Sequence, residues 1–445
     1  METVKKPENS IKTKAETLCG KAPWLGYSLA FFLFLCLYNY FIILGGRFSS
    51  VTAVVFTYHL VDFKLGFCSK ILPGAIFNLF FRQPTIKNVT VFETVLLLVS
   101  FAALSFLVAK VITSAKDRKT RRALTVIAFF FFAGPCTFSI YSCYTGMLDS
   151  YWLYFALIFM FFVENKYLKF VAPVLLFLMI AVHYAVIISY AAFACMILLY
   201  KAACAEDKKE KKTFIAILAV SAAASLAAFF YFLRFDSVNV KLPLEEFRAE
   251  LVKRAGPDGE RVDTQYYDMA FFRDYVTSSV EIGRQYGYVG KGLIPEIKWN
   301  LPAPLLNLIN LAFSQVYIAF HIEGTVIEKA FKAPYILALC LPLIIFIYSF
   351  WIKMIKAESS KLKKFCYFLG MAHYPFCVIV GLLNSTDILR WFSPAFIILI
   401  AYFLYAVYKE EKAKEIIRGK VLSFDWRLVA SYYFVYAVTA LVSFG

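Results

Sequence analysis

Four residues that could carry proton transfer lie in or beside short stretches between strongly apolar runs: Asp62, Asp149, His183 and Asp387. Asp62 is the only acidic residue of segment 46–88, and the other two aspartates each stand alone in a shorter stretch. An ionised carboxylate or a neutral imidazole can accept a proton from a hydroxyl group. If the fold gathers these side chains in one place, they predict general acid–base chemistry there.

Cations and aromatic rings accompany these acids in the sequence. Lys64 and Lys70 follow Asp62, and Arg390 follows Asp387. Ammonium and guanidinium groups stabilise a phosphate leaving group, and the guanidinium fork matches phosphate oxygens best. Aromatic rings suit stacking against sugars. We therefore assign catalytic roles to Asp62 and Asp149, substrate or phosphate binding to Lys64, Lys70, Tyr151, Trp152, His183, Asp387, Arg390 and Trp391, and no metal ligands.

The same residues also have structural explanations. Asp387 and Arg390 are three apart and could form a local ion pair. Asp149 stands just before an apolar run, where an aspartate caps a helix and favours its dipole. A histidine such as His183 is more often a hydrogen-bonded core residue, and Tyr and Trp favour membrane interfaces in general. Asp62 has no such explanation, because its apolar neighbours suit an amphipathic interfacial helix that would place Asp62 in the headgroup layer.

The elements that must position these residues are long apolar runs. The chain is 61% hydrophobic and 19% aromatic, and its mean hydropathy is +0.67. About 20 apolar residues span a hydrocarbon core, and in lipid such runs must be helical because every backbone polar group has to be paired. The sequence thus predicts an all-α polytopic protein with about eleven spans. The expected spans are 24–45, 89–112, 123–140, 151–163, 169–183, 185–200, 213–233, 334–354, 365–383, 391–408 and 427–444.

The distribution of Lys and Arg predicts the orientation. Basic residues are concentrated in alternate connections, and short cytoplasmic loops carry such an excess. This places the N-terminus in the cytoplasm and the C-terminus outside. The four aspartate and histidine positions then share the outer face. The basic segments are 1–23, 113–122, 164–169, 201–212, 353–364 and 409–420.

The expected organisation has four parts. Leu301 to Phe320 could cross the membrane, but a crossing there would put the basic stretch 353–364 outside, so we interpret it as re-entrant or interfacial. The parts are a cytoplasmic tail 1–23, a membrane module 24–233 of about seven spans with the outer loop 46–88 and its interfacial helix, an external segment 234–333 containing the helix 301–320, and a membrane module 334–445 of about four spans.

Several classes of protein are disfavoured. The net charge of +17 arises from clusters between apolar runs, and no basic soluble domain is left to bind nucleic acid. The ten cysteines show no CxxC and no spacing typical of metal ligands. The motifs GxxxxGK[ST], HExxH and GxSxG are absent, which argues against ATP-driven transport, intramembrane metalloproteolysis and common serine hydrolases.

A resemblance to a known class rests on three short motifs: Asp62…Gly66-Phe67…Ser69-Lys70…Leu72…Gly74, Gly146…Asp149 and Asp387…Arg390-Trp391. With its large late external segment, this arrangement resembles the GT-C class of polyprenyl-phosphate-sugar glycosyltransferases. It is also similar to bacterial polytopic proteins encoded near surface-polysaccharide genes. The resemblance implies that Asp62 is the catalytic base. The loop has one aspartate where the class commonly has two acids, and segment 234–333 lacks a WWD signature.

Three functions remain open from the sequence. The first is a glycosyltransferase or oligosaccharide polymerase, in which Asp62 is the base, Arg390 and Lys70 hold phosphate, and Asp149 and Asp387 position the acceptor. The second is a transporter or flippase for a lipid-linked or anionic substrate, which would need charges on broken helices at the midplane. The third is a non-catalytic membrane scaffold.

The expected setting is the plasma (inner) membrane of a bacterium, as a multi-pass protein. Its expected partners are membrane lipid, a lipid-linked saccharide and other proteins of envelope biosynthesis. The resemblance implies a polyprenyl-phosphate-linked sugar as donor. No cofactor follows from the residues, and a divalent cation is left open.

Overall fold

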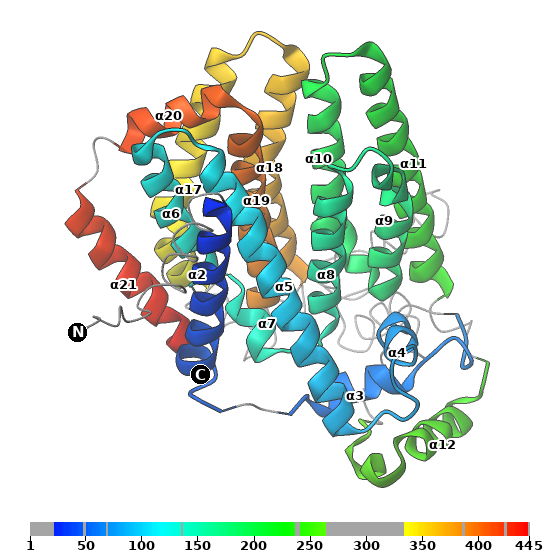
Figure 1. Cartoon of the computed structure of the whole chain (residues 1–445). Coiled ribbons are helices and arrows are strands. Elements are labelled where there is room, and N and C mark those ends of the chain that lie inside the picture. Colours follow the sequence, from blue (N-terminus) through cyan, green and yellow to red (C-terminus); the bar gives the residue numbers. More distant parts are fainter. Residues whose placement is uncertain are drawn as a thin grey trace, which may run out of the picture.

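The computed structural model describes residues 22–47, 50–67, 70–134, 137–235, 241–263, 333–384, 388–421 and 425–443. Secondary structure in these ranges is entirely helical, as predicted, with no strand among them. The longer helices lie roughly side by side, and shorter ones lie across both ends (Figure 1). The predicted helix 301–320 and Asp387 lie outside the described residues.

The first half of the chain builds one series of helices. They are α2 (Pro23–Leu37), the π-helix η1 (Tyr38–Ile43), α3 (Ala53–Leu60), α4 (Leu72–Phe77), α5 (Ile86–Ser114), α6 (Arg118–Phe132), α7 (Ser139–Cys143), α8 (Leu148–Phe162), the 3-10 helix η2 (Leu168–Val171), α9 (Ala172–Val182), the 3-10 helix η3 (Tyr184–Ile188), α10 (Tyr190–Cys204) and α11 (Lys208–Phe235).

Further helices lie in the described ranges from residue 241 onwards. They are α12 (Leu244–Ala255), the 3-10 helix η4 (Gly256–Arg261), α17 (Ala333–Ala357), α18 (Lys361–Asn384), α19 (Ile388–Lys409), α20 (Glu411–Val421) and α21 (Trp426–Ser443). Helix α2 packs along α5, α11 packs against both α9 and α10, and α18 packs against α19.

Seven helices in the described ranges are long and apolar enough to cross a membrane. They are Pro23–Ile43, Ile86–Ser114, Tyr184–Cys204, Lys208–Phe232, Pro334–Ala357, Lys361–Gly381 and Trp391–Lys409. The apolar helices Leu148–Phe162 and Leu168–Val182 are shorter. The protein therefore has the character of a membrane protein, while the expected eleven spans are not confirmed. The four expected spans that are not among these seven correspond to α6, α8, α9 and α21.

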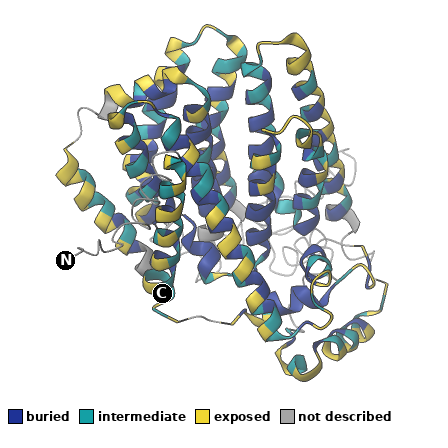
Figure 2. Cartoon of the chain, viewed as in Figure 1, coloured by how far each residue is buried: buried dark blue, intermediate teal, exposed yellow. Residues whose placement is uncertain are grey.

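Burial separates the central helices from the peripheral ones. The Trp391–Lys409 span is 83% buried within the protein, whereas the Pro23–Ile43 span is only 22% buried. Figure 2 shows the same contrast between buried central helices and more exposed outer ones. Along α2 the exposed leucines recur every four residues, which places them on one face of the helix. They are Leu25, Leu29, Leu33 and Leu37. Such an exposed apolar stripe is suited to lipid.

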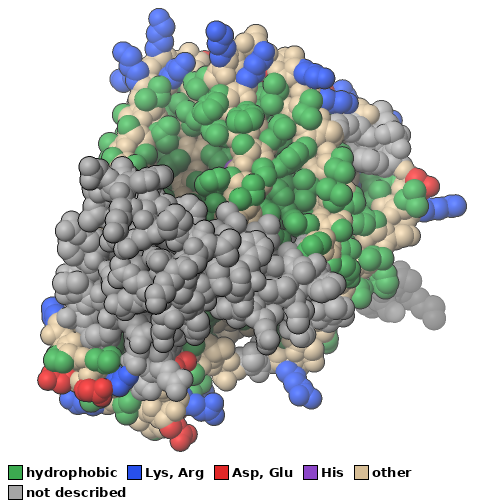
Figure 3. Space-filling model, turned by 180° about the vertical axis from the view of Figure 1, so that it is seen from behind, with side chains coloured by type: hydrophobic (Ala, Val, Ile, Leu, Met, Phe, Trp, Pro, Cys, Tyr) green, Lys and Arg blue, Asp and Glu red, His purple; other side chains and the backbone are tan. Residues whose placement is uncertain are grey.

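The two ends of the helix bundle differ in charge. Lys and Arg gather at one end, at the top of Figure 3, above a belt of apolar side chains. We call this the basic end. The turns α5–α6, α8–α9, α10–α11 and α17–α18 lie there, together with α20 (Figure 1). We call the other end, which carries α3, α4 and α12, the opposite end (Figure 1).

Two predicted elements differ in the structure. The span expected at 123–140 is α6, which begins at Arg118, where Asp117 caps it by accepting a hydrogen bond from Thr120 N at 2.8 Å. It ends before Gly134, which has φ +156° in the region that favours glycine. The interfacial helix expected through Asp62 is instead two short helices, α3 and α4, with Asp62 in the turn that follows α3.

Candidate functional site

A carboxyl group, an imidazole and a phenol meet inside the protein towards the opposite end. Glu93 comes from α5, His59 from α3 and Tyr151 from α8, and each of the three is 1% exposed or less. His59 Nε2 lies 2.8 Å from Glu93 Oε1 and 3.1 Å from the Tyr151 hydroxyl. Tyr151 also donates a short hydrogen bond to the same oxygen of Glu93. The cluster joins three helices that are far apart in sequence.

The hydrogen bonds of His59 restrict where its protons can be. Its Nδ1 lies 2.7 Å from the backbone oxygen of Val55, which can only accept, so Nδ1 carries a proton. Nε2 then either donates to ionised Glu93 or accepts from protonated Glu93. One proton is thus shared between the carboxyl group and the imidazole. Glu93 Oε2 is buried and meets no donor at hydrogen-bond geometry among the described residues, although the Tyr154 hydroxyl lies close enough to interact with this carboxyl group.

Local sequence explains how the cluster is held. Thr52 caps α3 by accepting a hydrogen bond from Val55 N, and Thr85 caps α5 by accepting one from Asn88 N. Gly146, just before α8, has φ +80°, a conformation that other residues adopt at a cost. A Cβ atom there would lie 2.7 Å from Glu93 Cγ, so only glycine allows this close approach.

A cavity of about 380 Å³ lies between α2, η1, α5 and α7, next to this cluster. Thr90 and Thr94, on either side of Glu93 in sequence, contribute to its lining, as does Thr145 beside Gly146. No charged residue lines it among those described. Asn39 and Ser142 are among the lining residues, and Asn39 Oδ1 and Ser142 Oγ are buried without a hydrogen-bond partner in the described part of the chain. Hydroxyl and amide groups of this kind suit an uncharged, hydroxyl-bearing ligand.

Asp62 lies at the surface of the same end, in contact with α12. Its Oδ1 accepts hydrogen bonds from Arg254 Nη1 and from the backbone of Lys64, both at 3.0 Å, and its Oδ2 accepts one from Asn78 at 3.1 Å. The Asp62 side chain is 13% exposed, so the ion pair is partly shielded. Arg254 also donates to Leu60 O at 3.0 Å. Asp62 therefore fastens α12 to the end of α3.

Lys70, Trp152 and His183 also lie at this end. Lys70, buried with φ +71°, donates its backbone N–H to Ala181 O at 3.1 Å, which ties its loop to the end of α9. His183 follows α9, and its ring lies edge-on to Trp152 with centroids 5.9 Å apart. His183 is partly buried, and its Nδ1 accepts a hydrogen bond from Ala185 N.

Asp149 is buried in the first turn of α8 and lies close to two tyrosines. Tyr141 and Tyr190 share a hydrogen bond of 2.5 Å between their hydroxyls, and both lie close enough to Asp149 to interact with it electrostatically. This pair links α7 to α10. Asp149 thus belongs to a second buried polar group near the first.

For the remaining predicted residues, the structure gives fewer contacts. Lys64 is exposed, and only its backbone N–H contacts Asp62. The side chain of Arg390 lies outside the described part. Trp391 packs close to Gly381 of α18, where a Cβ would lie 2.7 Å from Trp391 Cβ. No group of three His, Cys, Asp or Glu residues suited to a metal ion occurs among the described residues.

Sequence reasoning passed over Glu93, His59 and Asn39. Glu93 is the only acid within the 29 residues of α5, and a solitary carboxyl in an apolar span is a signal in its own right. His59 could not be found this way, because its partner is 34 positions away in sequence. Asn39 lies in a π-helical turn, a geometry frequent at functional sites but not readable from sequence.

The chain was also compared with models of protein families, with curated proteins and with solved structures, and none of them matches it.

Proposed function

We propose that the protein is a membrane-embedded glycosyltransferase or oligosaccharide polymerase. It transfers a sugar from a polyprenyl-phosphate carrier to an acceptor hydroxyl at the opposite end. The observation that supports this most is the buried Glu93–His59–Tyr151 cluster beside an uncharged cavity lined by hydroxyl groups. The cluster can move a proton, and the cavity has the size and polarity for a sugar unit.

The proposed membrane location and topology are those predicted from the sequence. The basic end faces the cytoplasm, the chain crosses a bacterial plasma membrane about eleven times, and the arrangement is GT-C-like. The opposite end, with the catalytic cluster, then faces outwards. Lipid-linked sugars reach that face with their carrier embedded in the outer leaflet.

In the proposed step, the proton of the acceptor O–H passes to the Glu93 carboxylate. The acceptor oxygen forms a bond to the anomeric carbon, and the bond from that carbon to the phosphate oxygen breaks. Polyprenyl phosphate leaves with the bonding electrons. Lys70 and Arg390 are the proposed cations for this phosphate, and His59 and Tyr151 hold and relay the proton at Glu93 Oε1.

The geometry changes the role proposed for Asp62. Three donors already occupy its carboxylate, one of them the guanidinium of Arg254. A general base needs a lone pair that is not already taken up by a fixed donor, and Glu93 Oε2 offers one. We therefore assign proton transfer to Glu93 and anchoring of α12 to Asp62.

Transfer of a radiolabelled sugar from the lipid carrier to the acceptor tests the proposal. Purified protein in nanodiscs receives polyprenyl phosphate carrying a radiolabelled hexose and an oligosaccharide acceptor, and labelled water-soluble product is counted. Glu93→Gln should reduce the rate about 100-fold or more, the usual contribution of a general base. Glu250→Gln is the control, because it also replaces a carboxylate by an amide, but in α12 and outside the Glu93 cluster. Full turnover in Glu93→Gln would exclude this mechanism.

The same assay separates the two roles of Asp62. If Asp62 anchors α12, Asp62→Asn lowers the melting temperature and turnover falls only as far as folded protein is lost. If Asp62 is the base, turnover disappears at an unchanged melting temperature.

A transporter is the second candidate, because an ionisable pair buried in a spanning helix is also typical of proton-coupled carriers. Glu93 lies eight residues into α5, nearer its end than its middle. Proteoliposomes distinguish the two functions. A transporter moves the lipid-linked sugar between leaflets unchanged, whereas a transferase releases polyprenyl phosphate.

A further inference from the structure

Several lysines at the basic end form ion pairs with an acidic residue. Lys201 and Lys409 both bind Glu164 Oε2, at 3.3 and 2.5 Å. Lys414 binds Glu411 at 2.8 Å. These pairs are explained by local charge balance and call for no ligand.

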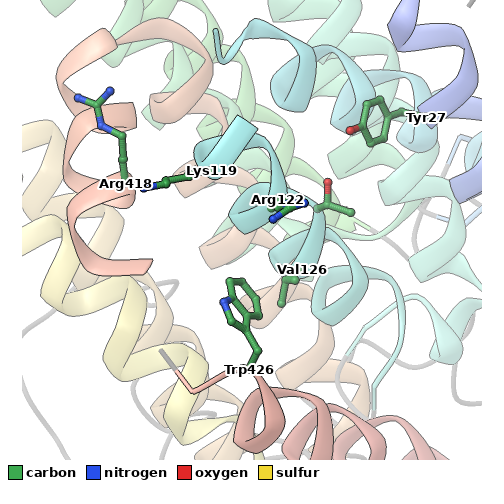
Figure 4. Close-up of a pocket in the computed structure, with 7 residues that line it drawn as sticks. Tyr27, Lys119, Arg122, Val126, Arg418 and Trp426 are labelled. Atoms are coloured by element: carbon green, nitrogen blue, oxygen red, sulfur yellow. The ribbon is translucent and has the colours of Figure 1, made fainter. Parts of the chain in front are cut away.

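Three other cations at this end differ from these lysines, because they are not paired with an acid among the described residues. Lys119 and Arg122 from α6 and Arg418 from α20 surround one cavity of about 580 Å³ (Figure 4). Within the part of the chain that the structure describes, none of them forms an ion pair or a side-chain hydrogen bond. Arg418 interacts electrostatically with Asp117, whose carboxylate is already used to cap α6.

The cavity brings these cations together from distant parts of the chain. Arg122 and Arg418 are almost 300 positions apart in sequence, yet both line it. No carboxylate belongs to its described lining. Like charges held around one space repel each other, and an anion in that space relieves the repulsion. Two guanidinium groups and an ammonium group match the several oxygens of a phosphate.

The remaining walls of the cavity indicate that the phosphate is attached to a lipid. Trp426, which is 45% exposed, and Tyr27 line it, and both residue types favour the level of lipid headgroups. A second, apolar groove of about 140 Å³ between α6, α17 and α21 shares Val126 and Trp426 with the cavity. Phe130, Leu343 and Phe346 are among the residues that line this groove.

We propose that the basic cavity and the adjoining apolar groove together bind one anionic membrane lipid, with its phosphate between Lys119, Arg122 and Arg418 and the start of an acyl chain on Val126 and Trp426. A free phosphate ion would have no use for the apolar groove, and a zwitterionic lipid would bring a further cation next to the three already there. Basic pockets between membrane helices recognise anionic headgroups in this way. This site lies at the basic end and does not depend on the proposed function.

Native mass spectrometry of the detergent-purified protein tests this site. Phosphatidylglycerol, phosphatidylcholine and inorganic phosphate are titrated separately. We expect one tightly retained phosphatidylglycerol, and the double variant Arg122→Gln/Arg418→Gln should weaken it about tenfold or more, as for the loss of charge-assisted bonds. The matched control Lys116→Gln/Arg118→Gln removes the same charge next to the cavity, from residues that do not line it. It should retain the lipid.

Both variants change exposed residues, and their melting temperatures verify that they fold. Phosphatidylglycerol with a brominated acyl chain gives a second readout, because it should quench wild-type fluorescence more than that of Trp426→Phe. Equal retention of phosphatidylcholine, unchanged retention in the double variant, or displacement of the lipid by equimolar inorganic phosphate would overturn the proposal.

Discussion

Glu93 illustrates how a single residue can reveal a site. Its Oε1 accepts from Tyr151 and contacts His59, whereas its Oε2 lies buried and meets no donor at hydrogen-bond geometry among the described residues. A buried oxygen left without a hydrogen bond costs about 1–3 kcal/mol. Such a cost persists at sites where the free lone pair has a use, and proton transfer is one.

Gly146 provides a residue-scale prediction about this site. We expect Gly146→Ala to destabilise the protein by about 3 kcal/mol or more, because backbone strain adds to overpacking. The new methyl group would lie 2.7 Å from both Glu93 Cγ and Val55 Cγ1. Chemical unfolding in detergent micelles measures the effect, and the proposed transferase activity should fall with it.

Gly45 supplies the control. It also has a positive φ, +58°, but a Cβ there would meet nothing within 4 Å. Gly45→Ala should therefore cost only the backbone strain, about 1 kcal/mol. Equal losses in the two variants would mean that the contact with Glu93 contributes nothing.

Among the elements, the turn between α8 and α9 shows how the basic end is tied together. Glu164 in this turn accepts a hydrogen bond from Tyr405 at 2.7 Å and pairs with Lys409, both of α19, and with Lys201 of α10. Three connections of the bundle therefore meet at one carboxylate. Burial raises the pKa of Glu164, but the hydrogen bonds from Lys409 and Tyr405 outweigh it and hold that pKa below its ordinary value of 4.5.

The lowered pKa of Glu164 predicts a loss of stability in acid. A carboxyl whose pKa is lower in the folded state stabilises the protein above its ordinary pKa, and this contribution disappears as the pH falls through the folded value. Melting temperatures should therefore fall more steeply below pH 4.5 in the wild type than in Glu164→Gln. Parallel curves for the two proteins would show that the network does not contribute.

The elements also show what the sequence could and could not predict. Long apolar runs predicted α2, α5, α11 and α17 because span length follows directly from bilayer thickness. The helix α3 was not predicted correctly, since its buried position depends on partners distant in sequence, such as Glu93. The ion pair between Asp62 and Arg254 joins positions 192 apart, and no local pattern encodes it.

At the scale of the whole molecule, the separation of the two ends is the main organising feature. The basic end carries the Glu164 network and the proposed lipid cavity, and the opposite end carries the Glu93 cluster and the Asp62–Arg254 pair. An anionic lipid bound at one end would reinforce the orientation that the basic loops favour. The proposed chemistry at the other end requires that end to face outwards.

Accessibility of inserted epitopes tests this orientation. A short epitope after Glu206, in the turn between α10 and α11, reports on the basic end, and one after Gly256, following α12, reports on the opposite end. In intact bacterial spheroplasts, antibody should reach the epitope after Gly256, and it should reach the other only after permeabilisation. The first site lies in a connection between helices, and the second lies at the junction of α12 with the short helix η4, where a Cβ would meet nothing within 4 Å. The reverse labelling would place the Glu93 cluster on the cytoplasmic side, where an outward-facing transfer reaction could not occur.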